Sequence, residues 1–127
     1  MASPAPHERP LSPHLTVYRQ PLTAVTSILN RITGNALIVG ALLMVWWLIA
    51  AATSAEYFGF VDGLVTSWLG DLVMTLSLWA LWYHYLAGLR HLYFDAGHGF
   101  DIATAEKLGW ACIIGSVVLT ILTLIII

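Results

Sequence analysis

Three long stretches of this 127-residue chain carry no Asp, Glu, Lys or Arg. They are residues 32–55, residues 72–89, and residues 108–127. An α-helix needs about 20 apolar residues to cross a bilayer core about 30 Å thick, and each stretch is close to that length. The pattern predicts three transmembrane helices, at roughly 23–53, 68–94 and 104–127. The apolar runs are continuous rather than alternating, which argues against a transmembrane β-barrel.

The composition excludes several classes of protein. Only 9% of the residues are charged and 59% are hydrophobic, whereas a soluble domain has about 25% charged residues. A soluble globular domain is therefore excluded, because so few charges cannot cover its surface. A single cysteine excludes a disulfide scaffold, a cysteine-rich zinc site and an iron–sulfur cluster held by this chain alone. A net charge of −2 provides no basic surface for nucleic acid.

The flanking residues predict the orientation of the spans. All five prolines fall within residues 1–22, which predicts an extended or irregular segment ahead of a three-helix membrane domain over 23–127. The first loop carries acidic but no basic residues, whereas Lys and Arg precede the first span or flank the second loop. The positive-inside rule then places the N-terminus in the cytoplasm and the C-terminus in the periplasm. The basic residues are Arg9, Arg19, Arg31, Arg90 and Lys107. The N-terminus carries no basic, serine-rich presequence, which favours a bacterial inner membrane.

A polar stripe runs along the second predicted span. At about 100° per residue, His91 lies about 20° from His84 around the helix, and Asp95 lies about 20° to its other side. Gly88 falls close to the same face. His84 is about 16 Å along the axis from Asp95, and therefore lies inside the bilayer. An ionisable side chain at that depth is energetically costly and indicates a function.

Three roles are open for His84: a hydrogen bond to a neighbouring helix, a proton relay, or ligation of a metal or haem. Gly88 favours haem, because a missing side chain lets a flat macrocycle approach the backbone. His84 and His91 stand about 10 Å apart on one helix face and cannot bind opposite faces of one iron. Neither of the other predicted spans contains a histidine. A haem with two imidazole ligands therefore requires a ligand from a partner membrane chain.

The other polar residues of this span lie closer to the cytoplasmic interface. His91 and Asp95 either end the helix in a polar zone or take part in the same function as His84. Arg90 points to a different face of the helix. It can hold a propionate, a lipid phosphate or nothing specific.

A second polar group opens the first span. Ser27 and Arg31 are i, i+4 neighbours, and Asn30 lies beside them at the predicted cytoplasmic membrane surface. This turn could bind an amphipathic ligand such as a quinone. A hydroxyl can donate a hydrogen bond to a quinone carbonyl, and a guanidinium can stabilise negative charge as the ring is reduced. Alternatively, Arg31 only anchors the helix end by extending into the headgroup region.

These motifs resemble the two signatures of the cytochrome b556 membrane-anchor family of succinate dehydrogenase (succinate:quinone oxidoreductase, respiratory complex II). The first signature is matched by Arg9-Pro10-Leu11-Ser12-Pro13-His14-Leu15, then Tyr18-Arg19, then Ser27-x-x-Asn30-Arg31-x-Thr33-Gly34. The second is matched by His84-x3-Gly88-Leu89-Arg90-His91-Leu92-x-Phe94-Asp95-x-Gly97. With three spans in a chain of this length, the resemblance covers nearly the whole sequence.

The resemblance implies an iron-binding role for His84 as an axial ligand of haem b. The second ligand is then supplied by a second small anchor subunit, and Arg31, Asn30 and His91 contact the haem. The family commonly has a histidine at the position of Asn30. Asparagine can donate a hydrogen bond but cannot titrate, so the family's proton and ionic roles do not transfer to that position.

The resemblance also implies a ubiquinone site that includes Ser27 and Arg31, with Asp95 assisting proton access. We therefore expect an all-α membrane protein whose three transmembrane helices pack with the partner anchor subunit into a haem-binding bundle, surrounded by membrane lipid. Such a chain anchors a flavoprotein that carries FAD and an iron–sulfur subunit. It passes electrons from succinate to quinone, in the tricarboxylic acid cycle and the respiratory chain. We expect catalysis from the assembled complex rather than from the isolated chain.

Three alternative functions predict different partners. A quinol:fumarate reductase anchor runs the same reaction in reverse. A small proton-coupled transporter subunit uses His84, His91 and Asp95 as a relay and binds no haem. A structural assembly protein has neither a haem nor a co-purifying flavoprotein.

Overall fold

The computed structural model describes residues 10–127, and every regular element within that range is helical. The elements are α1 (Leu22–Thr53), α2 (Ala55–Val65), α3 (Trp68–Asp95) and α4 (Ile102–Ile126). The helices α1, α3 and α4 are long and apolar enough to cross a membrane. The prediction of an all-α protein with three transmembrane helices is therefore confirmed. Arg9, the first residue of the first signature, lies outside the described residues.

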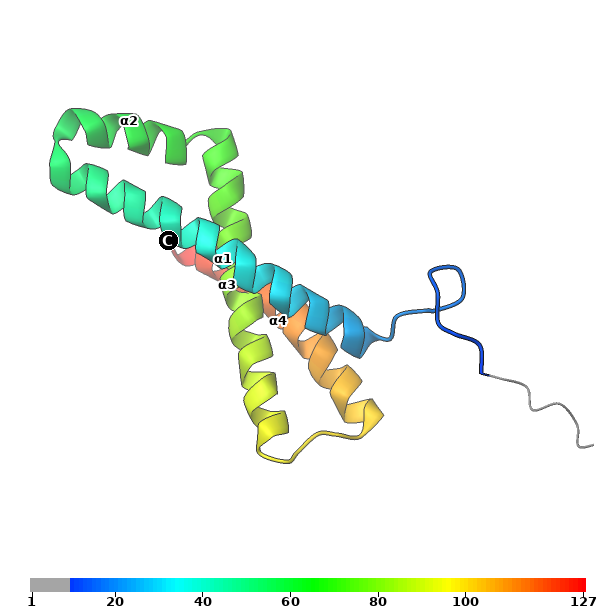
Figure 1. Ribbon diagram of the computed structural model, residues 1–127. Helices are drawn as coiled ribbons and strands as arrows, with labels where there is room; N and C mark the ends of the chain where they lie inside the picture. The colour runs from blue at the N-terminus through cyan, green and yellow to red at the C-terminus, as the bar shows by residue number, and fades with distance from the viewer. Residues whose placement is uncertain (1–9) are drawn as a thin grey trace, which may run out of the picture.

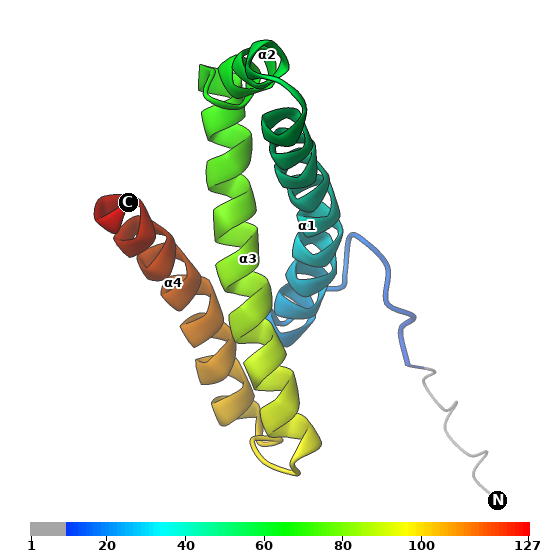
Figure 2. The same ribbon diagram turned by 90° about the vertical axis from the view of Figure 1, so that its left-hand side faces the viewer.

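The three long helices are arranged around α3. Figure 2 shows α3 between α1 and α4, with α2 lying across the end where α1 stops and α3 starts. The connection between α3 and α4 lies at the opposite end, as both ribbon views show (Figure 1). This arrangement gives the molecule two distinct ends, which face opposite sides of a membrane if the long helices cross it.

The short helix α2 was not predicted from the sequence. Ser54 caps it by accepting a hydrogen bond from the backbone N–H of its third residue. The indole Nε1–H of Trp47, in α1, donates to Asp62 Oδ1 in α2 at 2.9 Å. This tertiary contact ties α2 to the end of α1. The charge pattern of residues 55–65 indicates that this segment is too short and too acidic to span the bilayer. It does not predict the contact between Trp47 and Asp62.

The turn between α3 and α4 depends on two glycines and one cap. Gly97 and Gly99 adopt φ values of +84° and +76°, which residues with a Cβ rarely adopt. Asp101 then caps α4 by accepting a hydrogen bond from the Thr104 backbone N–H at 2.8 Å. Hydrogen bonding to Thr104 holds the pKa of the Asp101 carboxyl below its ordinary value. The turn is thus closed by local interactions at one end of the bundle.

Packing between the long helices is concentrated around Tyr83. Its side chain is fully buried and forms a small cluster with Ala87 of α3 and Cys112 of α4. Farther along, the indole Nε1–H of Trp82 donates to Thr123 Oγ1 of α4 at 3.0 Å. Much of the remaining apolar surface is exposed, which suits contact with lipid or with further helices.

Cysteine labelling tests the two-ended arrangement. In a Cys112→Ala background, Gly59→Cys and His98→Cys are expected to react with an impermeant maleimide from opposite sides of the membrane. Both positions are exposed, in α2 and in the α3–α4 turn, and a Cβ at Gly59 would meet no atom within 4 Å. The measurement is labelling of the assembled complex in right-side-out and inverted vesicles. Labelling of both positions from one side would contradict the fold.

Candidate functional site

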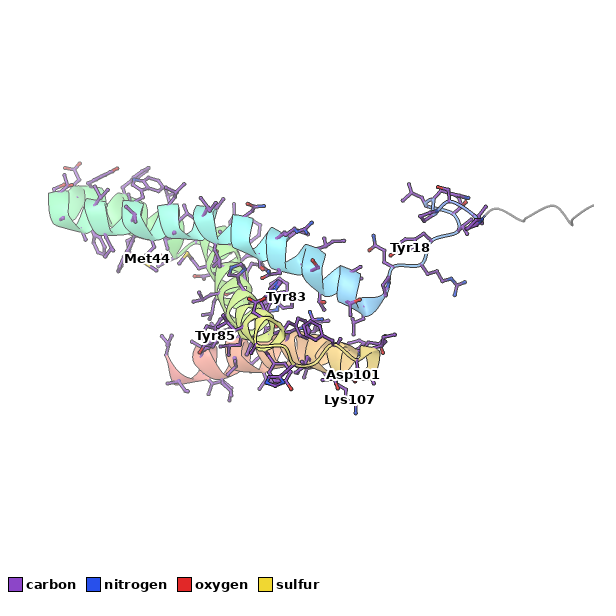
Figure 3. The ribbon with its side chains drawn as sticks, turned by 60° about the horizontal axis from the view of Figure 1, so that its bottom comes forward. Tyr18, Met44, Tyr83, Tyr85, Asp101 and Lys107 are labelled. Carbon is purple, nitrogen blue, oxygen red and sulfur yellow. The ribbon has the colours of Figure 1, made fainter. Side chains whose placement is uncertain are left out.

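The helix α3 donates three hydrogen bonds to the first half of α1. The Tyr83 hydroxyl donates to the Thr26 carbonyl at 3.0 Å, and one Arg90 terminal nitrogen donates to Thr26 Oγ1 at 2.8 Å. His84 Nδ1 lies 3.1 Å from the backbone carbonyl oxygen of Asn30. These bonds fix the rotation of the α1 turn that carries Ser27. In Figure 3, Tyr83 lies where α3 passes α1.

The hydrogen bond of His84 determines which ring nitrogen is free. A carbonyl oxygen can only accept, so Nδ1 must carry the proton in this contact. In the neutral ring, Nε2 then retains its lone pair and can bind a metal. Metal-binding histidines commonly donate their other N–H to a carbonyl in this way. The half-buried ring of His84 is therefore held in a tautomer in which it can act as a metal ligand.

Two glycines shape the space beside this imidazole. A Cβ placed on Gly34 of α1 would lie 3.0 Å from His84 Cε1, so glycine allows the ring to lie directly against α1. A Cβ on Gly88, one turn beyond His84 in α3, would meet nothing within 4 Å. The side of α3 at Gly88 is therefore open. Among residues 10–127, no group of three or more His, Cys, Asp or Glu residues could hold a metal ion.

A cavity of about 240 Å³ opens beside the same turn of α1. It lies between α1, α3 and the beginning of α4. Its polar lining consists of Thr23, Thr26, Ser27, Asn30, Arg90 and His91. Phe94 and Phe100 form part of its apolar wall, with their stacked rings 6.1 Å apart between centroids. The cavity thus combines hydrogen-bonding groups with aromatic faces, as a site for a ring-shaped ligand does.

The structure brings together some of the predicted site residues and separates others. Ser27, Asn30 and His91 line the cavity, although the His91 side chain remains largely exposed. Arg31 and Asp95 are exposed and do not line it. Asn30 connects the two parts of the site, because its backbone carbonyl contacts His84 and the residue also lines the cavity.

Arg90 is the site residue that the sequence left unassigned. Its second terminal nitrogen donates to the Ala105 carbonyl of α4 at 3.3 Å, and its guanidinium carbon lies 4.9 Å from the centroid of the Phe94 ring. The i, i+4 spacing of Arg90 and Phe94 could have predicted the contact between the guanidinium and the ring, because residues at this spacing are neighbours on a helix. Its contacts with α1 and α4 could not be predicted, because they depend on how the three helices pack.

The fold and site define a three-span membrane protein. The imidazole of His84, in a tautomer that can bind a metal, lies beside a polar cavity at one end of the bundle. Residues 5–123 match the family described as succinate dehydrogenase/fumarate reductase transmembrane subunit. The chain belongs to this family.

Named relatives agree with this assignment. The chain is 60% identical over 118 residues to the succinate dehydrogenase cytochrome b556 subunit of Paracoccus denitrificans, covering 93% of this chain and 91% of the relative. It is 36% identical over 116 residues to the subunit of that name from Rickettsia conorii, covering 91% and 90%. The succinate dehydrogenase cytochrome b560 subunit of Reclinomonas americana is 34% identical over 107 residues, with 80% and 74% covered. The resemblance inferred from the sequence is confirmed.

Removal of the Tyr83 hydroxyl tests the support of the α1 turn. Tyr83→Phe is expected to lower the stability of the bundle by about 1 kcal/mol, because it leaves the Thr26 carbonyl without its interhelical donor. The measurement is thermal unfolding of the solubilised complex. Tyr85→Phe is the matched control, because Tyr85 is 55% exposed and Tyr83 is fully buried. Equal melting temperatures of the Tyr83→Phe and Tyr85→Phe complexes would contradict a structural role for this hydrogen bond.

Proposed function

We propose that this chain is the haem b-binding membrane anchor of succinate:quinone oxidoreductase, and that it forms part of the ubiquinone reduction site. The observation that carries the proposal is the contact between His84 Nδ1 and the Asn30 carbonyl. It holds a metal-binding tautomer of His84 against the turn that contains Ser27 and Arg31. The cytochrome b names of the relatives support haem b as the cofactor.

In the proposed haem site, Nε2 of His84 binds the iron and Gly88 leaves room for the macrocycle. Bound haem b supplies one-electron redox chemistry. Arg31 and His91 are exposed on α1 and α3, where they can contact the polar edge of a bound cofactor. A second imidazole ligand would come from a second small anchor subunit, because no other histidine of this chain lies within a predicted span except His91, on the same helix face as His84.

In the proposed quinone site, the Ser27 hydroxyl donates a hydrogen bond to a ring carbonyl and Phe94 packs against the ring. Reduction of a quinone to a quinol consumes two electrons and two protons. The electrons come from an iron–sulfur subunit, which receives them from a flavoprotein that carries FAD and oxidises succinate. Exposed Arg31 at the edge of this turn stabilises negative charge, and exposed Asp95 assists proton access. Succinate oxidation is favoured over fumarate reduction because the named relatives are succinate dehydrogenase subunits.

The proposed location is a bacterial inner membrane with the N-terminus in the cytoplasm and the C-terminus in the periplasm. Arg90 and Lys107 flank the α3–α4 turn, at the end of the bundle that holds the cavity. The positive-inside rule then places this end in the cytoplasm, where the flavoprotein and iron–sulfur subunits dock. In the labelling experiment, a cysteine at position 98 is accordingly expected to react from the cytoplasmic side.

Substitution of His84 tests the proposed haem ligand. His84→Leu in the assembled complex is expected to remove or shift the haem b absorbance, because leucine cannot bind iron. His98→Leu is the control, because His98 is exposed in the α3–α4 turn. The measurement is the reduced-minus-oxidised spectrum of purified complex. A His84→Leu spectrum identical to that of the unaltered complex would exclude His84 as an axial ligand.

Substitution of Ser27 or Arg31 tests the proposed quinone site. Ser27→Ala and Arg31→Gln are each expected to slow quinone reduction by about tenfold, on the order of one lost hydrogen bond. Succinate oxidation by an artificial acceptor is expected to stay near its normal rate, because the flavoprotein is untouched. Ser77→Ala is the control, since the Ser77 hydroxyl bonds the Val73 carbonyl within α3. Equal loss of both activities would contradict a local role at the quinone.

A further inference from the structure

Two buried polar atoms of residues 10–127 have no hydrogen-bond partner, and they belong to residues that line the same cavity. One is the donor Nε of Arg90 and the other is the acceptor Oδ1 of Asn30. Buried polar groups are nearly always paired, and an unpaired one calls for an explanation such as a missing ligand. An unpaired donor and an unpaired acceptor in residues of one cavity are suited to a ligand that can both accept and donate hydrogen bonds.

The guanidinium of Arg90 is held so that Nε is the donor left over. Its terminal nitrogens bond Thr26 Oγ1 at 2.8 Å and the Ala105 carbonyl at 3.3 Å, while Phe94 lies against its face. Both of these partners are neutral oxygens. The contacts come from α1 and α4, so the guanidinium is fixed by all three long helices rather than free to turn to another partner.

Asn30 is held through its backbone. Its backbone belongs to α1 and its carbonyl oxygen accepts from His84, which fixes the position of the residue. Its Oδ1 is buried without a hydrogen-bond partner, in a residue that lines the cavity, and can accept one or two hydrogen bonds.

We propose that Arg90 and Asn30 are ligand-binding residues that together accommodate both redox forms of a quinone ring. The Nε–H of Arg90 donates to the ring oxygen of the oxidised form, which can only accept. Asn30 Oδ1 accepts from the hydroxyl of the quinol, which can also donate. This inference rests on the proposed function and extends it, because it names the groups that distinguish substrate from product.

The test measures the two redox forms separately in the assembled complex. The probes are a short-chain ubiquinone analogue, for its KM, and the corresponding quinol, for its inhibition constant. Arg90→Lys keeps the charge but loses Nε–H, and is expected to raise the KM for the quinone about three- to tenfold. Asn30→Leu keeps the backbone carbonyl but loses Oδ1, together with the Nδ2 amide group. It is expected to raise the inhibition constant of the quinol about three- to tenfold and to change the quinone KM by less than about twofold.

Controls separate ligand binding from packing and from the proposed function itself. Asn35→Leu, at an exposed position of α1, is expected to change neither constant. Equal changes of both constants in Arg90→Lys and Asn30→Leu, or no change in either, would overturn the proposed pair. Ser27→Ala could raise the quinone KM while Arg90→Lys and Asn30→Leu show no difference between quinone and quinol. That result would support the quinone site and contradict only the proposed roles of Arg90 and Asn30. If Ser27→Ala leaves quinone reduction intact, the proposed quinone site itself fails. If Arg90→Lys does not assemble, the selectivity of Asn30→Leu alone decides.

Discussion

The contact between His84 Nδ1 and the Asn30 carbonyl is the interaction on which the rest of the site depends. It fixes the tautomer of the imidazole, and it joins the middle of α3 to the α1 turn that lines the cavity. Gly34 makes the contact possible, because a Cβ there would lie 3.0 Å from His84 Cε1. The proposed haem ligand and the proposed quinone site therefore share one backbone group, and a displacement of the imidazole would move the turn that carries Ser27.

Much of this architecture could be predicted from the sequence. The spacing of charged residues predicted three spans, because the bilayer core sets the length of a helix that crosses it. The helical period predicted that His84, Gly88 and His91 lie on one stripe of a single helix. It could not predict the helix α2, because the contact that ties it to α1 joins an indole to a carboxylate 15 positions away. Nor could it predict that Arg90 lines the cavity, because its partners lie on α1 and α4.

The structure also explains why such a chain functions as one part of a larger assembly. It offers the imidazole of His84 in the middle of α3, a polar cavity at one end, and long exposed apolar faces. A haem that needs two imidazoles and a quinone that needs an electron donor are each completed by other subunits in the proposed function. The polar groups that line the cavity lie where α3 meets the first turns of α1.

The most direct test of the central claim is the reduced-minus-oxidised absorbance spectrum of the gently solubilised, unaltered complex. The proposed function predicts a haem b signal that co-purifies with this chain, together with a flavoprotein and an iron–sulfur subunit. A transporter subunit or a structural assembly protein predicts neither. A complex that contains this chain and the flavoprotein but shows no haem b signal would contradict the assignment of His84 as an iron ligand.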